Sequence, residues 1–95
     1  MADDAASLVR VVKIINSKGL HARASAKFVQ TAAKFDAAVS VQKDGSSVSG
    51  TSIMGLMMLG AGIGSELTLT SQGRQALEAM DALQSLINNK FGEDS

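Results

Sequence analysis

The sequence predicts an α+β domain in which three helices cover one face of a four-stranded, largely antiparallel sheet. Strand-like and helix-like hydrophobic periodicities follow one another in the order β-α-β-β-α-β-α. An Asp44-Gly45 pair between two short strand-like segments favours a tight hairpin, which joins antiparallel strands. The whole chain, residues 1–95, is short enough for one domain with one modest core, and we expect residues 1–7 and 92–95 to be loose ends.

The first half of the chain predicts a strand, a helix and a hairpin. Residues 8–15 are β-branched and apolar on both faces, which indicates a central strand. Residues 21–34 have apolar positions at helical spacing. The polar and mostly basic face of that helix carries Arg23, Lys27, Gln30 and Lys34. Residues 38–43 alternate between apolar and polar, and the polar residues 46–50 predict a short return strand at an edge.

The second half predicts a short apolar helix, a strand and a longer helix. Residues 53–59 are apolar nearly all round, with Thr51 or Ser52 as the N-cap. Residues 66–70 alternate as a strand, and residues 74–90 have apolar side chains at helical spacing. The segment before that strand is Gly60-Ala61-Gly62-Ile63-Gly64, which lacks the spacing of a nucleotide-binding glycine motif and therefore indicates a turn.

The composition excludes several classes of protein. The chain has no Cys and one His, which leaves no disulfide framework and no thiolate or multi-histidine metal site. We therefore expect no metal site, and we expect no cofactor. No apolar run approaches the ~20 residues that span a bilayer, and the start Met1-Ala2-Asp3-Asp4 is acidic where an export signal is basic. These observations predict a cytoplasmic domain that does not enter a membrane.

A formal net charge of zero hides an uneven distribution of charge. Seven of the nine Lys and Arg residues lie between Arg10 and Lys43, where Asp36 is the one acid. From Asp44 onward there are six acids and two bases. The neutral total, with no Trp or Tyr for stacking, argues against nucleic-acid binding. The basic half is better suited to a phosphate or to an acidic protein surface.

His21 is the candidate reactive group, because it stands where a helix begins. Free backbone N–H groups and the positive end of the helix dipole gather there, and Arg23 adds forked donors that match phosphate oxygens. A neutral imidazole nitrogen is a nucleophile that can form a bond to a phosphoryl group. The alternative is a histidine that only caps the helix, and the spacing leaves both interpretations open.

Ser52 and the helix after it also allow two interpretations each. Ser52 is either a simple N-cap or a phosphorylation site, at which the helix dipole tolerates the added charge. A short helix on a sheet buries one face, so some apolar side chains of residues 53–59 should stay exposed. These side chains are either core or an adaptable docking surface, for which methionine is well suited.

The chain closely resembles the HPr family, the histidine-containing phosphocarriers of the bacterial phosphotransferase system, at Gly19-Leu20-His21-Ala22-Arg23-Ala24-Ser25-Ala26. It is also similar to the regulatory-serine segment of that family at Ser52-Ile53-Met54-Gly55-Leu56-Met57-Met58-Leu59-Gly60. Ala24 stands where many members have Pro. The resemblance covers residues 8–91. It implies an open-faced β-sandwich, in which three helices cover an antiparallel four-stranded sheet.

The resemblance also implies roles for individual residues. His21 would accept a phosphoryl group on Nδ1 from enzyme I, which is charged by phosphoenolpyruvate, and would pass it to IIA proteins or domains. Arg23 would steady the phosphoryl group, and the backbone at Ala22 and Arg23 would bind its oxygens. Ser52 would be the target of an HPr kinase/phosphorylase. The partner-docking residues would be Ile53, Met54, Met57 and Lys27.

Two classes of function remain open from the sequence. The first is a stoichiometric phosphocarrier, monomeric and not an enzyme in the turnover sense. The second is a regulatory binding module, whose state at His21 or Ser52 changes its affinity for targets with little phosphoryl flux. The presence of both His21 and Arg23 favours the first class, and onward transfer of an acid-labile phosphate would distinguish the two.

Overall fold

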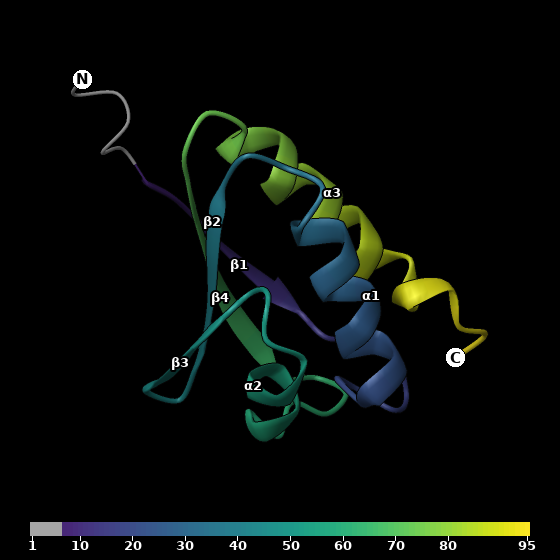
Figure 1. Cartoon of the computed structure of the whole chain (residues 1–95). Helices are drawn as coiled ribbons and strands as arrows, with labels where there is room; N and C mark the ends of the chain where they lie inside the picture. The colour runs from purple at the N-terminus through teal and green to yellow at the C-terminus, as the bar shows by residue number, and fades with distance from the viewer. Residues whose placement is uncertain (1–6) are drawn as a thin grey trace.

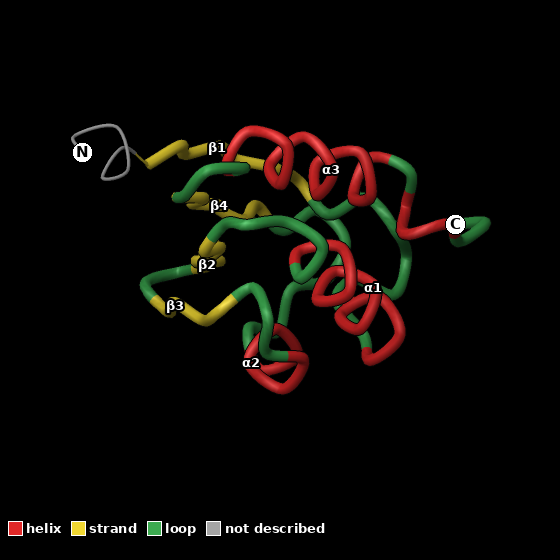
Figure 2. The backbone as a smooth tube through the Cα atoms, turned by 45° about the horizontal axis from the view of Figure 1, so that its top comes forward, coloured by secondary structure: helices red, strands yellow, loops and turns green. Residues whose placement is uncertain are grey.

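Four strands form one antiparallel sheet in this computed structural model, which describes residues 7–95. The strands are β1 (Ser7–Lys13), β2 (Ala38–Lys43), β3 (Ser46–Ser49) and β4 (Glu66–Gln72). The helices are α1 (Ala22–Ala32), α2 (Ile53–Met58) and α3 (Ala76–Asn88), followed by a 3-10 turn at Lys90–Gly92. The three helices lie on one side of the sheet and leave its other face open (Figure 1 and Figure 2). The predicted class and element order are confirmed.

The strand order is β1-β4-β2-β3, so β1 lies at an edge of the sheet. Within the described residues, β1 pairs only with β4, in a register that sets Val9 opposite Thr70. The prediction of a central first strand is therefore wrong. Its β-branched residues favour a pleated strand wherever the strand lies, and Val9 and Val11 are 64% and 58% exposed, whereas Val12 is buried against the core.

A tight hairpin joins β2 to β3 at the predicted turn. Asp44 and Gly45 have φ angles of 50° and 86°, the left-handed conformations that a two-residue hairpin loop requires. β3 pairs with β2 alone among the described strands and is an edge strand, as predicted.

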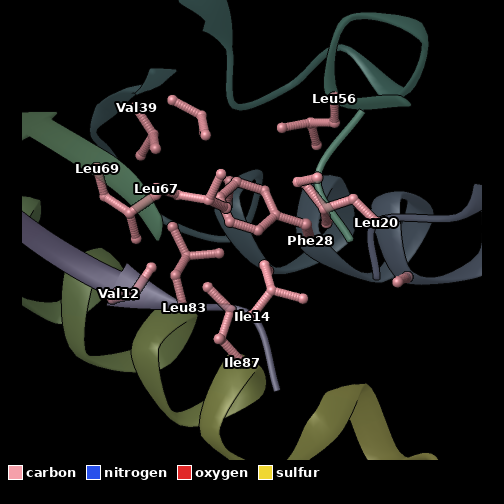
Figure 3. Close-up of a cluster of buried hydrophobic side chains, with 14 of the residues drawn as sticks. Val12, Ile14, Leu20, Phe28, Val39, Leu56, Leu67, Leu69, Leu83 and Ile87 are labelled. Carbon is pink, nitrogen blue, oxygen red and sulfur yellow. The ribbon is translucent and has the colours of Figure 1, made fainter. Parts of the chain in front are cut away.

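Apolar side chains from the sheet and all three helices meet in one core (Figure 3). Phe28 of α1 is fully buried and lies between Leu56 of α2 and Leu67 of β4. Burial of a side chain of this size stabilises the fold by about 1.5–3 kcal/mol. The sheet adds Val12, Val39, Val41 and Leu69, and α3 adds Ala79, Met80, Leu83 and Ile87. This packing fixes α1 against both the sheet and α2.

The loop before β4 holds the start of α1 in place. The Leu20 N–H donates to the Ala61 carbonyl oxygen at 2.9 Å, and the Leu20 side chain is buried. Gly19 has a φ of +65°, and a Cβ on it would lie 2.2 Å from the same carbonyl oxygen. Only glycine fits there. This close approach sets where the chain enters α1, and therefore where His21 stands.

The ends of several elements differ from the predictions. Ser7 belongs to β1, so the loose end predicted for residues 1–7 is wrong at that position, and residues 1–6 lie outside the described residues. The helix predicted over residues 74–90 is shorter, at Ala76–Asn88, because the chain turns into a left-handed conformation soon after it. This turn determines where the C-terminal residues lie.

Candidate functional site

His21 occupies the N-cap position of α1, with an extended backbone (φ −74°, ψ −179°). Its carbonyl oxygen accepts the Ser25 N–H at 2.9 Å, as the N-cap position requires. Its side chain makes no capping hydrogen bond and is 27% exposed. The imidazole therefore does not serve as a helix cap, and it remains accessible at the surface.

His21 lines a surface hollow of about 640 Å³ together with Lys18, Ala22, Arg23 and residues 93–95. The first N–H groups of α1 have no partner inside the helix. The hollow thus combines an imidazole, a guanidinium and helix-end donors, a set that suits the oxygens of a phosphoryl group. The predicted residues at the start of α1 are all found at this one place.

A carboxylate that the sequence did not predict at the site, Glu93, lies against His21. Its Oε2 atom is 2.5 Å from His21 Nε2, and its Oε1 atom accepts a hydrogen bond of 3.0 Å from Asn16 Nδ2. The hydrogen bond from His21, followed in importance by the one from Asn16, holds the pKa of the Glu93 carboxyl below its usual range. Asn16 is itself fully buried and also donates to the Gly19 carbonyl oxygen at 2.9 Å. Glu93 is therefore an ionised acceptor, held between the loop before α1 and the imidazole.

A left-handed turn brings Glu93 to this position. Lys90 and Phe91 have φ angles of 55° and 56°, and Gly92 follows at 78°. Left-handed conformations are strained for residues other than glycine and persist where the surroundings enforce them. Phe91 is fully buried, and its carbonyl oxygen accepts a hydrogen bond of 2.6 Å from Lys27 Nζ. Burial and this hydrogen bond hold the turn.

At Gly92 and Glu93 the structure differs from the loose tail expected for residues 92–95. Glu93 is 72 residues from His21 along the chain. The polar segment around Glu93 has the same composition as a tail that extends into solvent. No local pattern could have indicated the contact. Lys27 was expected on the docking surface, and its ammonium is engaged with the Phe91 carbonyl oxygen.

Ser52 is the N-cap of α2. Its Oγ atom accepts a hydrogen bond of 2.9 Å from the Gly55 N–H. The capping prediction is therefore confirmed, and phosphorylation of Ser52 stays a prediction.

α2 buries one side chain and exposes most of the others. Leu56 is fully buried, whereas Met54 and Met58 are 70% and 78% exposed, and Ile53 and Met57 about 42% and 41%. These four exposed residues form an apolar surface that we call the methionine face. Its most exposed member, Met58, was absent from the predicted docking set. α2 packs beside α1, so the methionine face and the hollow belong to neighbouring helices (Figure 1).

Metal ligation finds no support in the part of the chain that the structure describes. Residues 7–95 contain no group of three or more His, Asp or Glu side chains placed to hold a metal ion. None of the helices in that range has the length and apolar character to cross a bilayer. The site consists of side chains and backbone groups from α1, the loop before it and the C-terminal tail.

Comparison with known proteins places this fold and site in a family. Residues 8–89 match the family described as PTS HPr component phosphorylation site. The phosphocarrier protein HPr of Cupriavidus necator is 55% identical over 86 residues, which cover 90% of this chain and 97% of that protein. The phosphocarrier protein NPr of Shewanella violacea is 41% identical over 88 residues, which cover 93% and 97%. The crystal structure of HPr-C-His from Thermoanaerobacter tengcongensis has a TM-score of 0.89 and 44% identity, and covers 93% of this chain and 99% of that chain.

The open-faced β-sandwich and these relatives define the class of small phosphocarrier proteins. The chain belongs to the HPr family of the phosphotransferase system. The resemblance inferred from two sequence segments is confirmed, and so is the open-faced sandwich that it implied.

Proposed function

We propose that the chain carries phosphoryl groups on His21, taking each one from enzyme I, charged by phosphoenolpyruvate, and giving it to IIA proteins or domains. It acts stoichiometrically, as a monomer in the cytoplasm and without a cofactor. The observation that carries the proposal is that His21, Ala22 and Arg23 line the same surface hollow. An imidazole nitrogen can attack phosphorus there, while the guanidinium and the helix-end N–H groups take up the charge on the phosphoryl oxygens.

The methionine face is proposed as the docking surface for both partners, through Ile53, Met54 and Met57. The exposure of these side chains supports this, because isolated apolar residues are common on surfaces but a contiguous set on one short helix is not. Lys27 contributes positive charge on the neighbouring helix, which attracts an acidic partner.

Ser52 is proposed as the regulatory phosphorylation site, modified by an HPr kinase/phosphorylase. Its place at the start of α2 supports this, because the N-terminal end of a helix tolerates negative charge. A phosphoserine carries about −1.5 to −2 charges at pH 7, next to the apolar docking residues that follow it. The added charge should therefore act on docking and leave the fold intact.

Incubation with labelled phosphoenolpyruvate and enzyme I tests the carrier function. The wild type should take up one acid-labile phosphate, and His21→Ala should take up none, while Arg23→Ala should still be labelled but more slowly. Addition of an IIA protein should then remove the label from the wild type. Label that persists in His21→Ala would refute the assignment of the site. Label that no IIA protein removes would favour the regulatory binding module.

A further inference from the structure

We infer that Glu93 is a positioning residue, which keeps the proton of His21 on Nε2 and thereby leaves the Nδ1 lone pair free to accept the phosphoryl group. The inference rests on the function proposed above, because it concerns how the same imidazole is prepared for transfer. It adds to the site a residue that lies 72 positions away along the chain.

The chemistry of the pair determines which ring nitrogen is protonated. A neutral imidazole has a single N–H, and an ionised carboxylate can only accept hydrogen bonds. Glu93 Oε2 lies 2.5 Å from His21 Nε2, so this nitrogen is the donor. Within residues 7–95, no group forms a hydrogen bond to Nδ1, and the ring does not cap α1. Nδ1 is therefore the unprotonated nitrogen, and its lone pair is available.

Asn16 fixes the other half of the Glu93 carboxylate. The side-chain NH₂ group of Asn16 (Nδ2) donates two hydrogen bonds, one of 2.9 Å to the Gly19 carbonyl oxygen and one of 3.0 Å to Glu93 Oε1. The opposite orientation of this buried amide would set its oxygen against the Gly19 carbonyl oxygen. Asn16 therefore presents only donors to Glu93. Both carboxylate oxygens must act as acceptors, one for Asn16 and one for His21.

The arrangement suits both directions of transfer. In the forward step, the Nδ1 lone pair forms the bond to phosphorus, and the bond to the donor protein's atom breaks with its electron pair leaving on that atom. No proton has to leave the ring. With phosphorus on Nδ1 and hydrogen on Nε2, the ring carries a positive charge, which the Glu93 carboxylate faces directly. The transfer to an acceptor reverses these steps and restores the neutral ring.

A Glu93→Gln substitution tests the inference sharply, because an amide has one acceptor oxygen and not two. Its oxygen should face Asn16 Nδ2, since an NH₂ group there would meet another donor. Its NH₂ group should then face His21 Nε2, which can accept only when unprotonated. The ring proton should move to Nδ1 and block the nucleophile. Asp94→Asn removes an equal charge one residue further on and is the matched control.

The first measurement is the ¹⁵N NMR spectrum of the unphosphorylated proteins, at a pH high enough for the ring to be neutral. Protonated and unprotonated ring nitrogens have well separated shifts. We expect Nε2–H in the wild type and in Asp94→Asn, and a shift of the population toward Nδ1–H in Glu93→Gln. A wild-type ring protonated on Nδ1, or the same tautomer in all three proteins, would overturn the inference.

The second measurement is the kinetics of phosphoryl transfer from enzyme I. Glu93→Gln should lower kcat by roughly tenfold, because misplaced reacting groups lose at least that much rate, while KM for enzyme I should change little. An amide spectrum like that of the wild type shows that the fold is kept. An unchanged kcat would overturn the positioning role. The tautomer is measured on the unphosphorylated protein, so this measurement does not depend on the carrier function. If the tautomers are as expected but the His21→Ala variant is still labelled, the positioning of the ring proton by Glu93 is supported and only His21 as the acceptor is refuted.

Discussion

The Lys27 ammonium donates a hydrogen bond of 2.6 Å to the Phe91 carbonyl oxygen, and this contact joins the middle of α1 to the turn that ends the chain. Phe91 lies two residues before Glu93, which contacts the His21 imidazole, so the Lys27 hydrogen bond also helps to hold Glu93 against that ring. Lys27 thus has a structural role in addition to the docking role expected from its place on the basic face of α1. The two roles can be separated by experiment.

Lys27→Met should loosen the C-terminal turn. Met retains much of the apolar stem but cannot donate, so the Phe91 carbonyl oxygen loses its partner and the free energy of unfolding should fall by roughly 1 kcal/mol. Amide hydrogen exchange at Gly92 and Glu93 should become faster, because both N–H groups bond within this turn. Lys34→Met removes the same charge without that contact and is the control. Equal exchange rates in the two variants would contradict the prediction.

Gly19→Ala should destabilise the fold strongly. The φ of +65° costs a residue with a Cβ about 1–2 kcal/mol, and the overlap with the Ala61 carbonyl oxygen adds about 1–3 kcal/mol. Gly60→Ala is a matched control, since Gly60 has the same φ of +65° but a Cβ on it would meet no atom within 4 Å. Urea denaturation should show a clearly larger loss at Gly19 than at Gly60. Similar losses would mean that the close approach to Ala61 is unimportant.

Met54→Glu should weaken docking and leave the fold intact. Met54 is 70% exposed, so the free energy of unfolding should change by no more than about 0.5 kcal/mol, while the Kd for enzyme I should rise at least about tenfold. Leu77→Glu, at a 53% exposed position on α3, should leave the Kd unchanged. Titration calorimetry and thermal denaturation measure the two effects. A Met54→Glu protein that unfolds would show that this residue belongs to the core.

Ser52→Asp should slow transfer from enzyme I more at low salt than at high salt. Repulsion by a charge at a docking surface acts mainly on association and is screened over a Debye length of about 8 Å at physiological ionic strength. Asn is also a good N-cap but is neutral, so Ser52→Asn is the matched control. Both variants should melt near the wild-type temperature. Equal transfer rates for the two at low salt would leave Ser52 as a cap alone.

Acid should weaken the attachment of the tail. The pKa of Glu93 is lowered in the folded protein because His21 and then Asn16 donate to its carboxylate. Its contribution to stability is therefore fully present above the usual glutamate pKa, about 4.3, and is lost as pH falls through the lower folded value. The difference in Tm between wild type and Glu93→Gln should shrink below about pH 4. A difference that grows toward lower pH would contradict this sign.

The parts of the fold with local signals could be predicted from the sequence. The alternation of residues 38–43 predicted β2, and the Asp44-Gly45 pair predicted the hairpin, because each pattern reports on neighbouring residues. The same holds for His21 and Arg23, which are brought into one hollow by a single turn of helix. The cap at Ser52 was predictable for the same reason.

What the tertiary structure decided are the relationships between distant segments. The position of β1 at the sheet edge depends on which strands pair with it. The residues of β1 do not indicate these pairing partners. The hydrogen bonds of Glu93 reach Asn16 and His21, 77 and 72 residues earlier, and that of Lys27 reaches Phe91, 64 residues later. A polar tail has the same sequence pattern whether it is solvated or docked. Only the packing of Phe91, which brings the tail back onto α1, distinguishes the two.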